Sequence, residues 1–399
     1  MSVDTRLRPA PADRTARIAV AALFLTNGAL FANLVPRLPQ IKTGLALDNA
    51  AYGIVVAAFP AGAIVVGLTA AALIRRFGSA PLAVISTLLT GTALWAAVTV
   101  PSALALAALL FVAGAVDSVT DVAQNAHGLR VQRRYGRSII NSFHALWSIG
   151  AVTGGSMAAV AIALDMPLGV HMGIVAVLCG VVALVALRFC LPGRDDAPED
   201  VPETRAPVAK RGRVGVRTAL LLTALVLIAV GGTVVEDAGS SWATLYLSAD
   251  LGAPAALAAT GFIALVGAQF VGRLLGDRLV DRFGQRTVAR AGGVLVAAGM
   301  GLALAFPTVP GTILGFAASG LGVATLVPAA MHEADEIPGL RTGTGLTLVS
   351  WLMRLGFLLS PPLVGLVADA AGLRVGLLVV PLAGVLVIGL SGVLQTRRR

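Results

Sequence analysis

Apolar blocks of about twenty residues recur along this whole chain, and they restrict its fold more than any other feature. Each is long enough to cross a hydrocarbon core of ~30 Å as a helix. An unpaired backbone amide costs several kcal/mol in lipid, so such segments must be helical. The sequence therefore predicts an all-α polytopic membrane protein with twelve transmembrane helices. The predicted spans are residues 17–39, 50–74, 80–99, 101–127, 138–163, 168–191, 216–248, 254–277, 286–306, 309–332, 342–368 and 373–394.

Composition agrees with this class. Only 13% of the 399 residues are charged, whereas about a quarter is usual for soluble domains. The cations gather before the first span, after the second, fourth, sixth and eighth, and at the C-terminal end, while the other connections hold few. This positive-inside pattern predicts a multi-pass protein of the plasma (inner) membrane with both termini cytoplasmic. The net charge of +10 therefore reflects topology, and a nucleic-acid partner is not expected.

One long polar segment, residues 192–215, divides the spans into two sets of six and reads as a flexible cytoplasmic linker. The text LIRRFG at 73–78 returns as LVDRFG at 279–284, and the same offset of 206 residues relates further glycines. We expect two pseudo-symmetric six-helix bundles with a site between them, as in transporters built from parallel repeats. The predicted regions are a cytoplasmic tail 1–16, an N-terminal bundle 17–191, the linker, a C-terminal bundle 216–394 and a basic tail 395–399.

The fourth span carries its polar side chains on one face. In GAVDSVTDVAQNAHG, residues 114–128, a helical repeat of ~100° per residue gathers them on about a third of the circumference. Ionised Asp near the membrane centre costs at least ~2.5 kcal/mol on insertion scales, so such residues tend to mark ion or substrate paths. Asp117 and Asp121 are therefore candidate proton carriers, and Gln124 and Asn125 candidate cavity residues. A purely structural hydrogen-bonding role is the alternative for Asp121.

Three further spans present polar faces that we assign to the same cavity. An interior packing role is the alternative for the His and the Trp among them. The cavity candidates are Asn141 and His144 in the fifth span, Ser240 beside Glu236 in the seventh, and Trp351 and Arg354 in the eleventh.

Arg354 lies roughly 18 Å into its span, where an unpaired guanidinium is expensive. We expect it to pair with Glu236, Asp237 or Asp121, or to bind an anionic group on a substrate. Glu236 is thus a candidate for proton coupling, and it and Asp117 are equally candidates for a structural counter-charge to Arg354.

The segment GDRLVDRFGQR at 276–286 resembles the loop signature of the major facilitator superfamily. The resemblance implies a cytoplasmic loop whose charged residues help to hold the two halves in one conformation. Independently, Gly284 is suited to a tight turn. The residues implied in this latch are Gly276, Asp277, Asp281, Arg282, Gly284 and Arg286.

A second resemblance is narrower. DVAQNA at 121–126 and NSFHALWSIGA at 141–151 resemble the fucose permease branch of that superfamily. It implies that Asp121 takes part in proton coupling and that Asn125 faces a sugar site. His144 stands where a Gln contacts substrate in that branch. Asn33 lies beside the place of an acidic residue in the first span and is a further cavity candidate.

Several chemistries have no support in the sequence. It contains no GxxxxGK[ST] loop for ATP, no HExxH motif or Cys cluster for a metal, and no GxSxG elbow. We therefore expect no enzyme activity, no cofactor and no metal. The prediction is a monomeric secondary transporter that works by alternating access, coupled to protons, and moves a small polar solute such as a sugar or related metabolite through the lipid membrane. The alternatives are a proton-driven exporter of drugs or metabolites and a ligand sensor on the same fold.

Overall fold

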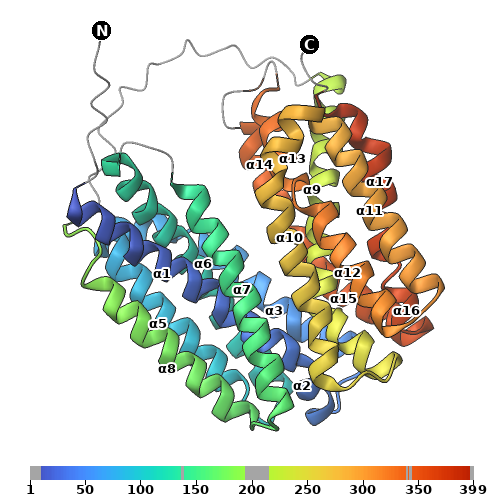
Figure 1. The fold of residues 1–399 in the computed structure, drawn as a ribbon, viewed down its shortest axis with the longest axis horizontal. Coiled ribbons are helices and arrows are strands. Elements are labelled where there is room, and N and C mark those ends of the chain that lie inside the picture. The colour runs from blue at the N-terminus through green and yellow to red at the C-terminus, as the bar shows by residue number, and fades with distance from the viewer. Residues whose placement is uncertain (1–9, 136–138, 194–214, 338–339, 341–343, 396–399) are drawn as a thin grey trace.

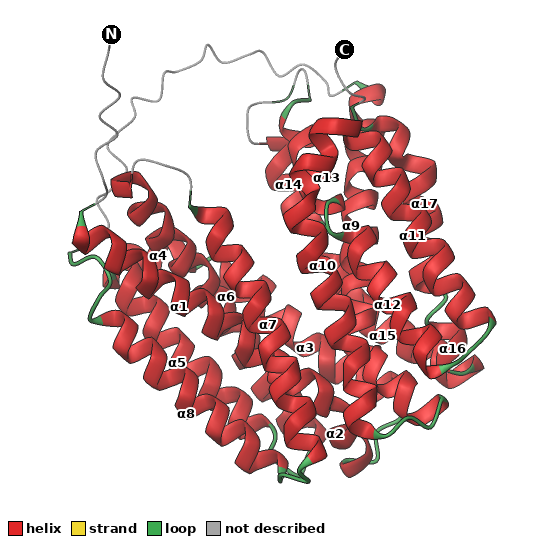
Figure 2. Ribbon diagram, in the orientation of Figure 1, coloured by secondary structure: helices red, strands yellow, loops and turns green. Residues whose placement is uncertain are grey.

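A computed structural model describes residues 10–135, 139–193, 215–337, 340 and 344–395. All the regular secondary structure in these ranges is helical. Twelve helices are long and apolar enough to cross a membrane. Figure 2 shows the helices in red, joined by short connections. The predicted fold class and number of spans are confirmed. The linker and both tails fall largely outside the described residues.

The first six spans form one bundle, drawn in blue to green in Figure 1. The second span stops after Gly67 and resumes as a short helix, whereas the sequence predicted one continuous span over 50–74. The elements are α1 (Pro11–Leu34), the 3-10 turn η1 (Val35–Arg37), α2 (Leu38–Gly44), α3 (Asn49–Gly67), α4 (Ala70–Phe77), α5 (Ser79–Ala97), α6 (Ala103–Tyr135), α7 (Ile140–Ala163) and α8 (Leu168–Leu187).

The last six spans form a second bundle, drawn in yellow-green to red in Figure 1. Its elements are α9 (Val216–Leu245), the π-helical turn η2 (Tyr246–Asp250), α10 (Ala255–Phe283), α11 (Gln285–Ala305), α12 (Val309–Val323), α13 (Leu326–Asp335), α14 (Thr344–Leu352), α15 (Arg354–Ala371), α16 (Leu373–Gly376), α17 (Val379–Leu390) and the 3-10 turn η3 (Ser391–Val393).

Three of these spans are interrupted where the sequence predicted continuous helices, and the twelfth breaks at Leu377 and Leu378, between α16 and α17. The tenth breaks after Val323 because the ring of Pro328 conflicts with the carbonyl of Ala324, four residues earlier. The eleventh breaks at Met353, whose carbonyl oxygen accepts a hydrogen bond of 2.9 Å from the Thr233 hydroxyl. A side chain inserted in this way disturbs the helical ladder. Arg354 is consequently the first residue of a new helix.

The internal repeat predicted from the sequence is visible in the packing of the helices. Gly78 and Gly284 end α4 and α10 with φ of +83° and +82°, a conformation that favours glycine. A Cβ at Gly114 would meet the Phe59 carbonyl, and one at Gly320 would meet the Leu265 carbonyl. Phe59 and Leu265 are separated by the same 206 positions. The two halves therefore pack their second and fourth spans by the same close contact.

The two bundles meet at one end and separate at the other. In Figure 1 they lie side by side near α2 and α3, and they diverge toward the side on which α1 and α9 begin. Across the bundles α3 packs on α15, α7 on α10 and α2 on α9. We call the diverging side the terminal side and the other the joined side.

Contacts on the joined side are specific. The Asp369 carboxylate at the end of α15 accepts hydrogen bonds from the backbone N–H groups of Asn49 (3.0 Å) and Ala50 (2.7 Å) and from the Asn49 amide (2.9 Å). It thereby accepts hydrogen bonds from backbone N–H groups at the start of α3 that have no partner within the helix. Nearby, the Tyr52 hydroxyl donates to the Ser241 carbonyl at 2.6 Å. Small residues permit this approach, because a Cβ at Gly53 would meet the Pro361 carbonyl.

Candidate functional site

The polar face of the fourth span divides into two environments. Asp117 accepts a hydrogen bond of 2.8 Å from the Asn27 side-chain amide of α1. The Asn27 carbonyl oxygen in turn accepts from Trp147 Nε1 of α7 (2.9 Å) and from Gln124 (3.3 Å). Asn27 is buried and joins three helices of the first bundle. Asp117 thus belongs to a network inside that bundle.

Asp121, one turn later, is exposed. Its carboxylate accepts a hydrogen bond of 3.0 Å from the Asn125 amide on the same helix. The side chain of His144, also exposed, lies within electrostatic range of this carboxylate, and its ring stacks edge-on against Phe24 at 5.3 Å between centroids. Asp121, Asn125 and His144 therefore form an accessible polar group on α6 and α7.

The second bundle contributes an ion pair that the sequence analysis missed. Glu236 of α9 accepts a hydrogen bond of 2.7 Å from the Gln269 amide, and Arg273 of α10 lies 3.8 Å from the same carboxylate oxygen. Arg273 is within electrostatic range of His144 on the other bundle. The signal for Arg273 was present, since it is a cation in the predicted eighth span, 254–277. Ser241 donates to the buried Asp237 at 3.3 Å.

Arg354 is not in contact with any of the three carboxylates expected as its partner. Glu236 and Asp237 have other partners, and no described residue forms an ion pair or hydrogen bond with the Arg354 guanidinium. Instead the side chain reaches the first bundle, where its Nη1 would lie 3.6 Å from a Cβ built on Gly67, beside Ser118. Asp121 is within its electrostatic range without direct contact. A cation from the second bundle thus faces the polar stripe of the first.

The remaining cavity candidates differ in how far they are buried. Gln124 and Asn33 are fully buried within the first bundle, where Asn33 lies 3.0 Å from His171, so neither lines a space between the bundles. Both differ from the expectation because helices of the same bundle cover them. Ser240 is half-buried and Trp351 exposed. Asn141 lies in α7, with its side chain outside the described part of the chain.

The loop residues predicted to latch the halves lie on the terminal side. Gly284 makes the expected tight turn, Gly276 is buried in α10, and Asp277, Asp281 and Arg282 are exposed. Arg286 differs from the expectation: it donates to the carbonyls of Gly392 (2.6 Å) and Leu394 (3.0 Å) and so holds the end of the last span within its own bundle.

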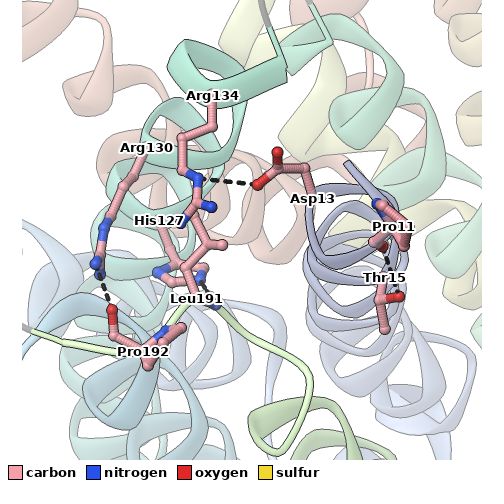
Figure 3. A network of polar contacts seen from close by, with 8 residues as sticks. All are labelled: Pro11, Asp13, Thr15, His127, Arg130, Arg134, Leu191 and Pro192. Carbon is pink, nitrogen blue, oxygen red and sulfur yellow. Dashed lines mark hydrogen bonds and ion pairs between the residues drawn. The ribbon is translucent and has the colours of Figure 1, made fainter. Parts of the chain in front are cut away.

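The first bundle has comparable contacts on this side, shown in Figure 3. Arg134 of α6 pairs with Asp13 of α1 at 2.9 Å. Arg130 donates to the Pro192 carbonyl, and His127 Nε2 accepts from the Leu191 N–H at 3.2 Å. These contacts join α1, α6 and the end of the sixth span. On the terminal side, cations of both bundles thus hold their own bundle together.

No group of three or more His, Cys, Asp or Glu side chains suited to a metal occurs among the described residues. The arrangement instead offers two half-sites of polar and charged side chains. The first bundle supplies Asp121, Asn125 and His144, and the second supplies Glu236, Arg273 and Arg354.

Comparison with known proteins identifies the family of this chain. The sequence pattern of the Major Facilitator Superfamily matches residues 20–279 and 237–399. The chain belongs to this superfamily. It is 30% identical over 382 residues to the uncharacterized transporter y4wD of Sinorhizobium fredii, with 94% of this chain and 97% of that protein covered.

Solved structures share the fold of this superfamily member at low identity. A mutant form of the nucleoside transporter NupG has a TM-score of 0.76 and 12% identity, covering 94% of this chain and 98% of its own. A D-xylose-proton symporter has a TM-score of 0.69 and 15% identity, covering 95% and 96%. At these identities the likeness shows the fold alone.

Proposed function

We propose that this superfamily member is a secondary active transporter of a small polar solute, a sugar or related metabolite, and that it works by alternating access with proton coupling. The observation that carries the proposal is the pair of half-sites, with exposed Asp121 on one bundle and Arg354 of the other bundle within electrostatic range of it. A solute bound between them contacts both bundles. Its binding then depends on how the bundles are arranged, as alternating access requires.

The arrangement of the bundles supports this mechanism. They are joined by the Asp369 and Tyr52 contacts on one side and diverge on the other. With both termini cytoplasmic, as the alternation of cations predicts, the diverging side faces the cytoplasm. We therefore infer an inward-facing state of a monomer in the plasma (inner) membrane.

Asp121 is the proton carrier in this proposal. Its carboxylate is accessible, whereas Asp117 is tied to Asn27 and Glu236 to Gln269 and Arg273. An acid that exchanges protons with solvent and also senses the opposite bundle can link proton binding to bundle movement. The branch-level resemblance of DVAQNA supports both the coupling role and a sugar-like solute, with Asn125 as a contact for solute hydroxyls.

Proton flux in liposomes tests the proposal. The purified protein is reconstituted, and internal pH is followed while neutral sugars, organic acids and lipophilic cations are added in turn. Solute-dependent acidification of the lumen is expected for a symporter. Asp121→Asn is expected to keep solute exchange and lose uphill accumulation, while Asp165→Asn, the same change in the exposed turn between α7 and α8, behaves as the parent protein. Normal accumulation by Asp121→Asn would refute the assignment of the proton carrier.

The same assay separates the alternatives. Alkalinisation of the lumen upon addition of lipophilic cations favours a proton-driven exporter. Solute binding without any flux favours a sensor. The relative y4wD is named as a transporter, which agrees with the absence of enzyme motifs in the sequence.

A further inference from the structure

Arg354 stands apart from the other charges of the site because it lacks a counter-charge in contact. Among the described residues, each carboxylate on the polar faces of the fourth and seventh spans already accepts a hydrogen bond from another side chain. These pairs are Asp117 with Asn27, Asp121 with Asn125, Glu236 with Gln269 and Arg273, and Asp237 with Ser241. Arg354 is half-buried and has no such partner.

A guanidinium in this position is costly unless something neutralises it. Asp121 is within electrostatic range of Arg354 but accepts no hydrogen bond from it. The N–H donors of the Arg354 guanidinium therefore remain open to an acceptor group on a bound solute. From this we infer, on the basis of the proposed transport function, that the solute carries a carboxylate which Arg354 binds, and that it is a small hydroxycarboxylate such as a sugar acid.

Geometry favours a carboxylate over other anions. The planar guanidinium fork matches a carboxylate through two parallel hydrogen bonds. Arg273, the other cation of the site, is already paired with Glu236, so a single cation is left to meet the solute. A phosphate monoester carries about −1.5 to −2 at neutral pH and would bring more negative charge than Arg354 neutralises.

The surroundings suit the hydroxylated part of such a solute. Asn125 and His144, which interact with Asp121, offer donors and acceptors on the first bundle. Polar groups of this kind orient a ligand within a cavity. The Arg354 side chain itself lies against Gly67 and Ser118. A carboxylate bound there touches the interface between the bundles.

Calorimetric titration of the full-length protein in detergent tests the inference with ligands that share one ring. Glucuronate, glucose, glucosamine and glucose 6-phosphate differ chiefly in charge, and gluconate and lactate extend the carboxylate set. We expect binding of one or more carboxylates, with glucose and glucosamine weaker. Arg354→Gln should weaken carboxylate binding at least about 30-fold, and Arg354→Lys, which keeps the charge and loses the fork, should weaken it less.

Controls keep the result interpretable. Arg188→Gln removes an exposed cation at the end of the sixth span and should bind as the parent protein does. Melting temperatures of all variants show that each is folded. If glucose binds as tightly as every carboxylate, if no carboxylate binds, or if Arg354→Gln leaves carboxylate affinity unchanged, the inference is wrong.

Failure here is distinguishable from failure of the transport proposal. Proton flux driven by a neutral sugar, lost in Asp121→Asn and kept in Arg354→Gln, would leave the proposed function standing and overturn the anionic solute. Carboxylate binding that depends on Arg354, with no flux in liposomes, would support the anion site and remove the coupled-transport mechanism.

Discussion

The joined side of the molecule makes a quantitative prediction about conformational equilibrium. Asp369→Ala removes three hydrogen bonds between α15 and the start of α3, with lengths of 2.7 to 3.0 Å. These bonds exist only while the bundles are joined on this side. Because Asp369 is exposed, solvent screens it, and we assign the set a total of roughly 1–2 kcal/mol.

Free energy of this size changes the ratio of the two bundle arrangements by about 5- to 30-fold, since 1.4 kcal/mol corresponds to tenfold. The expected direction is toward separation on the joined side. Spin labels are placed at exposed Thr43 in α2 and Ala255 in α10, in a variant whose buried Cys179 and Cys190 have been replaced. Double electron–electron resonance then measures the distance between the two labels across the joined side. A longer-distance population should grow in Asp369→Ala.

Asp48 provides the matched control. Its carboxylate caps the same helix start through the Ala51 N–H at 2.7 Å but belongs to the first bundle. Asp48→Ala therefore weakens the helix start and leaves the cross-bundle bonds in place. Equal distance distributions for the two variants, or no change in Asp369→Ala, would refute the argument that these bonds hold the joined side closed.

Two further predictions concern packing and buried polarity. Gly114→Leu or Gly320→Leu introduces a side chain against the carbonyl of Phe59 or Leu265. We expect each to lower the free energy of unfolding by about 1–3 kcal/mol or more through overpacking, and so to lower the melting temperature. The same temperature for Gly389→Leu and Gly320→Leu would contradict this, because Gly389 faces open space. Asn27→Leu leaves Asp117, Trp147 and Gln124 without their shared partner; each group left unsatisfied costs about 1–3 kcal/mol. Thermal unfolding checks this as well, and a variant as stable as the parent would show that water or other groups replace Asn27.

Much of the architecture followed from local properties of the sequence. Hydropathy over successive segments predicted the twelve spans, and the repeat between LIRRFG and LVDRFG anticipated the matching turns at Gly78 and Gly284. The interruptions were harder to predict. The break at Met353 depends on a hydroxyl from Thr233, a residue 120 positions away. No property of the eleventh span alone contains that information.

The candidate site shows the same division at the level of side chains. Helical periodicity indicated that α6 carries a polar face, and polar faces on other spans indicated a shared cavity. Helical periodicity could not predict which charged side chains pair with each other. Glu236 was one of three carboxylates expected as a partner of Arg354, but the neighbouring helix α10 supplies Arg273 and Gln269 to it instead. Asn27, an ordinary polar residue of the first span, became central only because three helices converge on it.

By itself, then, the sequence determined what each segment must do: cross the membrane as a helix, end at a glycine, or turn a polar face away from lipid. These requirements act within one helix and its solvent, so they are readable along the chain. The tertiary structure alone decided which helices face each other, hence which charges pair and which do not. Asp369 meets Asn49 across 320 positions, and Arg354 lies beside Gly67 and Ser118. Such contacts arise because packing brings distant helices together, and no local pattern encodes them.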